Sequence, residues 1–481
     1  MSDRYRTEGY KGVPLSFEPS ALPDRAVGGL LIEGGAVVTV DDRFTVHDPG
    51  WVHLLDDRIE GLGSGDAPAE VRLAVSRTID ATGSAVMPGM VNGHTHLFQT
   101  FFRGLADDKS LLDWLRECIW PGAVHLDGDA AHLAAMLGLV ENLRTGATSI
   151  IDHQYIHIDE SIDDAVCLAA SQSGVRFLLA RGWADRNYEP SLSESADLVL
   201  SRSESVRTNW DGHDGGRLRI ELAPLSPWGC SNEAMTMTVA ASRSWGAGTH
   251  IHCAETAIEV EMSVEERGMR HVPWLDSLGV LGPDTQLAHS VWLDDDELDL
   301  IAARGSVVVH CPVSNMYLAS GVPRIVEMME RGIPIALASD GPGSNNRQDL
   351  FEAMKMAVLL QKVDRLDPMA LQPEDALRMA CRGGATAFGQ PESLGMLAPD
   401  RKADVVIVDL DSVFTAPVHR VPSALVFCAS PAQVSHVIVD GRVLIDEGVV
   451  TMLDEKALRS AANAAARRVF ERAGIASRIT R

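Results

Sequence analysis

The chain has 481 residues, of which 46% are hydrophobic and 23% charged, and its formal net charge is −25. This composition is typical of a globular protein with a large core. The negative charge disfavours nucleic acids and anionic membranes as partners. The sequence contains no run of about 18 uncharged apolar residues, so it predicts no membrane span. Seven scattered cysteines without a Cys-x-x-Cys pair, and a polar segment at residues 1–6 in place of an apolar signal core, indicate a cytoplasmic protein with reduced thiols.

Short segments of alternating apolar and polar residues occupy both ends of the chain. They cover residues 29–33, 36–40, 51–55, 58–62, 403–409 and 436–443. Such segments, separated by turn residues, are typical of a small β-sandwich. We therefore predict one composite β-sandwich domain formed by residues 1–84 and 396–450. A segment rich in alanine and arginine, residues 453–475, predicts a helix within the last region, residues 451–481.

Strand and helix patterns alternate between these two ends. The predicted strands are residues 85–91, 147–152, 175–181, 218–223, 248–252, 285–289, 306–310 and 334–339. Helical patterns lie between most of them, for example at residues 130–143, 232–244 and 294–303. Eight strands that alternate with helices predict an α/β fold, a (β/α)8 barrel of the TIM type, over residues 85–395. The active site of such a barrel lies at the C-terminal ends of its strands.

Histidines mark the ends of the first and fifth predicted strands. His94 and His96 are two residues apart, so both imidazoles point to one face of an extended chain and can bind one metal ion, most readily zinc. In the fifth strand His250 and His252 share a face, and spacing alone leaves open which of them binds the metal. The position of His252 nearer the strand end, three residues before Glu255, favours His252.

Two more strand ends complete the predicted site. The sixth strand supplies His289 and the eighth supplies Asp340. Three histidines and one aspartate around zinc leave a position for water, whose pKa the metal lowers to about 7. We expect Asp340 to accept the water's proton, Glu255 to carry a proton to a ring nitrogen and then to the leaving group, and His289 to steady the attacking hydroxide. The fourth strand contains no lysine to bridge two metals, which favours one metal per chain, zinc or alternatively Fe²⁺.

The motifs around these residues resemble those of the amidohydrolase superfamily. The closest resemblance is to the branch that holds guanine, 8-oxoguanine and S-adenosylhomocysteine deaminases and s-triazine hydrolases, and it covers about residues 30–450. The matching segments are residues 87–96, 252–255, 288–289, 310–321, 339–341 and 402–406. The resemblance implies that the metal ligands are His94, His96, His252 and Asp340. It also implies catalytic roles for Glu255 and His289, and contacts to the substrate from Gln99 and Arg181.

The sequence departs from its relatives at positions that contact substrate. Deaminases of nucleosides carry a histidine in the fourth strand, where this chain has Leu225, and a ribose-binding glutamate in the region of residues 119–123, which has none here. Triazine hydrolases carry a polar residue after the metal-binding aspartate, where this chain has Gly341. We therefore expect a zinc-dependent aminohydrolase of a free amino-heterocycle, such as a guanine-like purine, a pterin, isocytosine or an aminotriazine.

Alternatives stay open for several of these residues. Gln99 would otherwise form hydrogen bonds with backbone at the barrel mouth, and Arg181 an ion pair with a barrel carboxylate. Four tryptophans either stack on a flat ring or fill space in the core: Trp114, Trp120, Trp183 and Trp228. His153, at the end of the second strand, contacts substrate or makes a structural hydrogen bond.

Two other functions compete with deamination. The same fold could displace chloride or alkylamine from an s-triazine, or open a cyclic amide. The chain could also be a catalytically inactive metal-binding scaffold, although Glu255 and Asp340 are both present. For any of these functions we expect a small heterocyclic molecule as the partner and a homo-oligomer, a dimer or a tetramer.

Overall fold

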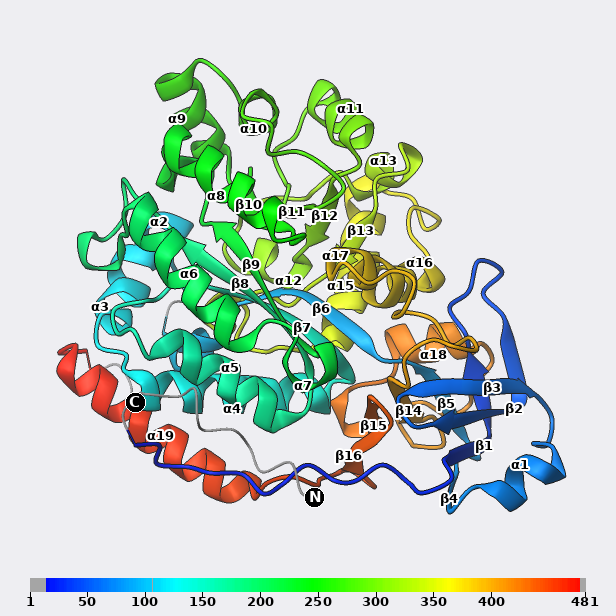
Figure 1. Cartoon of the computed structure of the whole chain (residues 1–481). Helices are drawn as coiled ribbons and strands as arrows, with labels where there is room; N and C mark the ends of the chain where they lie inside the picture. The colour runs from blue at the N-terminus through cyan, green and yellow to red at the C-terminus, as the bar shows by residue number, and fades with distance from the viewer. Residues whose placement is uncertain (1–13, 106, 476–481) are drawn as a thin grey trace.

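Two sheets organise the structure, a computed structural model that describes residues 14–105 and 107–475 (Figure 1). The first sheet has eight parallel strands paired in chain order. These are β6 (Met90–Thr95), β7 (Ala147–Gln154), β8 (Arg176–Trp183), β9 (Leu218–Pro224), β10 (Thr249–Cys253), β11 (Thr285–His289), β12 (Val307–His310) and β13 (Ile335–Leu337). The backbone N–H of Asp340, just past β13, donates to the carbonyl of His94 in β6 at 3.1 Å, which brings the last strand to the first. The predicted (β/α)8 barrel is confirmed.

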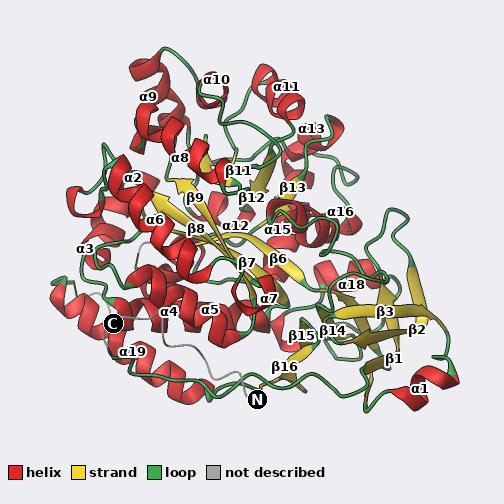
Figure 2. Ribbon diagram, viewed as in Figure 1, coloured by secondary structure: helices red, strands yellow, loops and turns green. Residues whose placement is uncertain are grey.

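Helices surround these strands, and a few others, such as α1, lie beside the second sheet (Figure 2). The longer ones are α4 (Gly128–Arg144), α5 (Ile162–Ser173), α6 (Ala196–Trp210), α8 (Asn232–Ser244), α9 (Ala257–Arg267), α11 (Asp295–Arg304), α15 (Leu350–Arg365) and α19 (Glu455–Arg472). The shorter ones are α1 (Ala69–Ala74), α2 (Leu111–Trp114), α3 (Trp120–Ala123), α7 (His213–Gly216), α10 (His271–Ser277), α12 (Pro312–Tyr317), α13 (Ile325–Glu330), α14 (Pro342–Asn345), α16 (Pro373–Arg378), α17 (Gly384–Ala387) and α18 (Val421–Phe427). Local caps explain their bounds: α11 begins at a capping box of Asp294 and Glu297 and ends at Gly305, whose φ is 75°.

The second sheet joins both ends of the chain, as predicted. Its strands run in the order β17 (Val449–Val450), β16 (Arg442–Asp446), β15 (Val434–Val439), β14 (Val405–Asp409), β5 (Ser84–Pro88), β1 (Leu30–Val38), β2 (Val46–Leu55) and β3 (Arg58–Ser64), and β4 (Arg77–Asp80) pairs with β1. Val405 pairs with Pro88 across the junction between the N-terminal and C-terminal strands. Figure 1 shows this mixed sheet beside the barrel, with α19 running along α4.

One strand prediction was wrong. Residues 85–91 do not form the first barrel strand, because the chain changes sheets at Gly89, between β5 and β6. A Cβ at Gly89 would lie 2.1 Å from Oγ1 of Thr148, so only glycine allows this close approach. Its N–H donates to the carbonyl of Asp404 and not to a barrel strand. The barrel strand therefore begins later than predicted and already contains His94.

In the described residues, no helix combines the length and apolar character needed to cross a membrane. The polar segment at residues 1–6 lies outside the described residues.

Candidate active site

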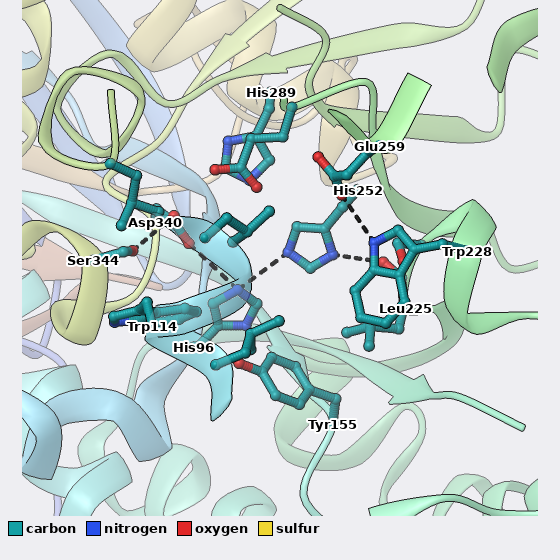
Figure 3. A pocket seen from close by; sticks show the side chains of 15 residues that line it. His96, Trp114, Tyr155, Leu225, Trp228, His252, Glu259, His289, Asp340 and Ser344 are labelled. Carbon is teal, nitrogen blue, oxygen red and sulfur yellow. Dashed lines mark hydrogen bonds and ion pairs between the residues drawn. The ribbon is translucent and has the colours of Figure 1, made fainter. Parts of the chain in front are cut away.

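A pocket lies at the C-terminal ends of the barrel strands (Figure 3). Its polar lining comes from strand ends and from the segments that follow them: His96, Ser226, His252, Glu255, Glu259, His289, Asp340 and Ser344. Its other walls are aliphatic and aromatic: Leu111, Trp114, Leu115, Tyr155, Leu225, Trp228 and Leu318. The structure thus brings most of the predicted site residues into one cavity.

His94, in the first barrel strand, and His96, just after it, lie against the aspartate that follows the last barrel strand. Nε2 of His94 and Nε2 of His96 are 3.4 Å and 3.3 Å from Oδ1 of Asp340. All three residues are buried. Oδ2 of Asp340 accepts hydrogen bonds from Ser314 at 2.6 Å and Ser344 at 2.8 Å, which leaves Oδ1 directed at the histidines.

Hydrogen bonds to backbone carbonyls set the tautomers of two rings. Nδ1 of His96 lies 2.7 Å from the carbonyl oxygen of His153, and Nδ1 of His252 lies 2.6 Å from that of Leu225. Because a carbonyl only accepts, both Nδ1 atoms carry the proton and both Nε2 atoms hold a lone pair. These two Nε2 atoms lie 3.3 Å apart. Nε2 of His94 is also buried and has no hydrogen-bond partner in the described part of the chain.

Converging lone pairs of this kind fit a divalent cation of the zinc class. Two overlapping groups have ligand atoms within 4.8 Å of one another: His94, His252 and His289, and His94, His96 and His153. The residues present therefore fit a metal ion, and His94, His96, His252 and Asp340 stay its predicted ligands.

Two further histidines lie next to this cluster. Nε2 of His250 lies 2.8 Å from Nδ1 of His94, so His250 orients that ring instead of facing the pocket. His153 places Nε2 3.2 Å from the carbonyl oxygen of Ala223, and it is not among the residues that line the pocket.

Left-handed backbone marks the ends of three barrel strands. The φ angles of Ala254, His289 and Asp340 are 47°, 68° and 61°. An L-residue in this region costs about 1–2 kcal/mol, and such strain persists mainly where the surrounding structure imposes it, often at active sites. At His289 and Asp340 the turn places a polar side chain in the pocket instead of continuing the strand.

Glu255 and His289 face each other across the pocket. Oε2 of Glu255 lies 3.7 Å from Nε2 of His289, and both side chains are buried. Burial raises the pKa of Glu255 to about 7, even though nearby His289 acts to lower it. Burial acts against the charged form of His289, but Glu255 and Asp340 together raise the pKa of His289 above its ordinary value. A carboxyl group that titrates near neutral pH suits the transfer of protons.

Gln99 does not line the pocket. Its Oε1 accepts a hydrogen bond from the backbone N–H of Gly343 at 3.2 Å, and its Nε2 donates to the hydroxyl of Tyr155 at 2.9 Å. A Cβ at Gly341 would lie 2.1 Å from Oε1 of Gln99, so the glycine makes room for the amide. Gln99 therefore stands behind Tyr155, which does line the pocket.

Arg181 is also removed from the pocket. Its Nε donates to Asp163 at 2.8 Å, and its two Nη atoms donate to Glu194 at 2.9 and 3.1 Å. The side chain is completely buried in this network. Of the four tryptophans considered, Trp114 and Trp228 line the pocket.

Sequence reasoning did not single out several residues of the pocket. Among them are Tyr155, Ser226, Glu259, Leu318 and Ser344. Glu259 accepts from the indole N–H of Trp228 at 2.9 Å and from Thr256, so it holds a pocket wall in place. All five residues lie within 15 residues of a strand end. The sequence does not show which residues near a strand end reach the cavity, because this depends on how separate loops pack together.

Known proteins resemble this chain over most of its length. A model of the amidohydrolase family matches residues 85–444. The 5'-deoxyadenosine deaminase of Methanothermobacter thermautotrophicus is 39% identical over 87% of this chain and 94% of that protein. The 5-methylthioadenosine/S-adenosylhomocysteine deaminase of Pelotomaculum thermopropionicum is 35% identical over 93% of this chain and 100% of that protein. A solved adenosine deaminase of Xanthomonas campestris with bound zinc has a TM-score of 0.86 at 29% identity, covering 94% of this chain and 100% of that one.

The family model spans most of this chain, and both relatives match this chain along nearly their whole length. The resemblance predicted from the sequence motifs is confirmed, as is the prediction of a hydrolase that acts on carbon–nitrogen bonds. The protein belongs to the amidohydrolase family.

Proposed function

We propose that this protein is an aminohydrolase that removes the amino group of an adenosine-type nucleoside as ammonia, with 5'-deoxyadenosine as the preferred substrate. The observation that carries the proposal is a buried carboxyl group, Glu255, whose pKa burial raises to about 7 and which lies 3.7 Å from His289 in a pocket with largely apolar walls. The polar groups suit proton transfer to a ring nitrogen, and the walls suit a flat heterocycle.

The relatives support a nucleoside. Two of them, 39% and 35% identical to this chain, are named for 5'-deoxyadenosine and for 5-methylthioadenosine and S-adenosylhomocysteine. Their names favour this class over the free base expected from the departures at Leu225 and residues 119–123. The residues that line the pocket include Leu111, Leu115 and Leu318, and apolar side chains of this kind support a substrate without a polar group at its 5' carbon.

The side chains divide the chemistry between them. Glu255 would deliver a proton to the ring nitrogen next to the amino-bearing carbon while the oxygen of a water molecule adds to that carbon. Asp340 and His289 would take the two protons that this water gives up; one of these protons passes to the amino nitrogen, and the other returns to Glu255 and restores its carboxylic acid. The carbon–nitrogen bond then breaks, ammonia leaves, and the ring keeps a carbonyl group.

A divalent cation, which we propose to be zinc, fits the four predicted ligands. His94, His96, His252 and Asp340 would hold it, because three lone-pair nitrogens and a carboxylate oxygen converge there. When bound, such an ion lowers the pKa of a water molecule at the site.

A second candidate is deamination of a free amino-heterocycle. Leu225, which lines the pocket, favours it, since this position offers no hydrogen bond to a substrate. The pocket also lacks a glutamate from residues 119–123, a segment that reads Ile-Trp-Pro-Gly-Ala.

A substrate panel separates these functions. We would measure ammonia release from 5'-deoxyadenosine, 5'-methylthioadenosine, adenosine and S-adenosylhomocysteine, from adenine, guanine, pterin and isocytosine, and ammonia or chloride release from melamine and atrazine. We expect 5'-deoxyadenosine to exceed adenosine in kcat/KM by about tenfold or more, because burying an unpaired hydroxyl costs about 1–3 kcal/mol. A Glu255→Gln preparation controls for contaminating deaminases. Turnover of free bases with none of nucleosides would reject the proposal in favour of the second candidate.

A further inference from the structure

One turn of the chain contacts three residues of the pocket. It consists of residues 314–320, in and after α12, and follows β12 at the barrel mouth. Ser314 donates to Oδ2 of Asp340 at 2.6 Å, Asn315 accepts from His289, and Ser320 donates to Glu255. We refer to residues 314–320 as the α12 turn.

Asn315 determines which nitrogen of His289 faces the pocket. Oδ1 of Asn315 lies 2.9 Å from Nδ1 of His289. An amide oxygen only accepts, so Nδ1 carries a proton, and Nε2, on the side of Glu255, is the nitrogen left to exchange a proton in the pocket. Nδ2 of Asn315 is buried without a hydrogen-bond partner in the described part of the chain. The buried amide is therefore held by its oxygen alone, through His289.

The two carboxyl oxygens of Glu255 have different partners. The hydroxyl of Ser320 donates to Oε1 at 3.1 Å, whereas Oε2 faces His289. One oxygen is thus held in place, and the other is available to take up and release a proton. Backbone hydrogen bonds couple the two halves of the turn, because the N–H of Ser320 donates to the carbonyl of Asn315 at 2.8 Å. The indole of Trp292 also donates to the carbonyl of Ser320 at 2.6 Å.

We propose that the α12 turn is a single positioning element for proton transfer, in which Asn315 sets the tautomer of His289 and Ser320 orients the carboxyl group of Glu255. Neither residue lines the pocket, so both act through another side chain. The inference rests on the proposed function, since it assigns the turn to the proton transfers of that reaction. It adds that one segment of the chain orients both side chains that transfer protons.

The test combines a tautomer measurement with kinetics on Asn315→Leu, which keeps a similar volume but accepts no hydrogen bond. Imidazole ¹⁵N spectra, with the His289 signals assigned through His289→Gln, should show Nδ1–H in the wild type and loss of that tautomer in the variant. On the best substrate of the panel, kcat should fall about 10–100-fold, as for other lost partners of catalytic side chains, with KM changed far less. Asn315→Asp, which restores an acceptor, should recover much of the loss.

Controls separate positioning from folding. Met329→Ala changes an exposed side chain outside the α12 turn and should keep wild-type kcat. In a His289→Ala background, Asn315→Leu should cost nothing further, because Asn315 would have no ring to orient. Asn315→Ala replaces Asn315→Leu if the larger side chain prevents folding.

Three results for Asn315→Leu would overturn the inference. These are an unchanged tautomer of His289, an unchanged kcat, and a fall in kcat in the His289→Ala background as large as in the wild type. The spectra require no turnover. If the wild type proved inactive on every nucleoside, the proposed function would fail while the tautomer still tested the role of Asn315.

Discussion

Glu255 shows how a single side chain acquires a role that its residue type does not specify. Its carboxyl group is buried at the end of a left-handed turn that begins at Ala254, with one oxygen held by Ser320 and the other facing His289. Burial stabilises the neutral acid, and this places the pKa of Glu255 at about 7. A solvent-exposed glutamate would be ionised at neutral pH and could not donate a proton.

The first prediction concerns Glu255→Gln. The amide keeps the shape of the side chain and can still accept from Ser320, but it carries no transferable proton. We expect the variant to fold and to hold its metal while kcat falls by about 10²–10⁴, the usual cost of losing a general acid–base group. Elemental analysis and ammonia release measure the two effects. Loss of the metal, or near-normal turnover, would show that Glu255 has another role.

A second prediction concerns Gln99 and Tyr155. Because Nε2 of Gln99 donates to the Tyr155 hydroxyl, that bond does not use the phenolic proton, which Tyr155 can donate to a substrate. We expect Gln99→Ala and Tyr155→Phe each to raise KM by up to about tenfold, the value of one hydrogen bond, and the double variant to be no worse than either. Gln372→Ala, which removes an amide bonded to the backbone of Met369 outside the pocket, is the control. Additive losses would mean that Gln99 contacts the substrate itself.

At the scale of elements, the strand ends create the site. β6, β10, β11 and β13 each place a polar side chain at or just past their last residues, and the closed barrel turns these ends toward one point. The loops add what the strands cannot supply. α14 contributes Ser344 to hold Asp340, and the α12 turn contacts three side chains at once.

The third prediction is metal content, and it belongs to these elements. The purified protein should hold about one zinc or similar ion per chain, as expected for four converging ligands. His94→Ala and Asp340→Ala should each lose both metal and activity. His53→Ala, which changes a histidine of the second sheet, should keep both. Two tightly bound metal ions per active chain would contradict a mononuclear site.

At the scale of the whole molecule, a buried ion pair joins the barrel to the second sheet. Nε of Arg176, on β8, donates to Asp404 at 2.6 Å, and its Nη2 donates to Asp440 at 2.7 Å. Asp404 precedes β14 and Asp440 follows β15, so one arginine ties a barrel strand to the C-terminal half of the other sheet. Burial acts to raise the pKa of Asp440, but Arg176 and Arg25 hold the pKa below its ordinary value.

The fourth prediction is that Arg176→Met destabilises the fold. Removing Arg176 takes the buried cationic partner from Asp404 and leaves Asp440 paired mainly with Arg25, at a cost of up to about 3–5 kcal/mol in unfolding free energy. In the wild type the pKa of Asp440 is lower in the folded state than in the unfolded state. Asp440 therefore contributes its full stability at pH values above the unfolded pKa, and this contribution is lost as the pH falls through the folded pKa. Without Arg176, less positive charge opposes the effect of burial, so the pKa of Asp440 should rise from its wild-type value and acid should unfold the variant at a higher pH. Urea unfolding across pH measures both effects.

Arg72→Ala is the control for this prediction. It removes an exposed ion pair with Glu33 and should cost less than about 1 kcal/mol. Equal stability of the wild type and Arg176→Met, at neutral and acidic pH, would show that this ion pair does not hold the two sheets together.

The sequence alone determined the fold class and the family, and it predicted the polar residues at the strand ends. Period-two and period-3.6 patterns report backbone geometry over a few residues, so they located the barrel strands and predicted α8 over the same residues that the structure assigns to it. Placing His94, His252 and Asp340 at strand ends required only the barrel rule. The same local patterns could not show that the chain changes sheets at Gly89, because a continuous apolar run reads as one strand.

Only the tertiary structure decided which partners these side chains have. The sequence left Gln99 and Arg181 each with two alternatives, and the fold placed Gln99 against Gly343 and Arg181 between Asp163 and Glu194. It also brought Asn315 to His289. Hydrogen bonds and ion pairs act over about 3 Å. The residues that they join here are far apart along the chain, and only the folding of the barrel brings them within that distance.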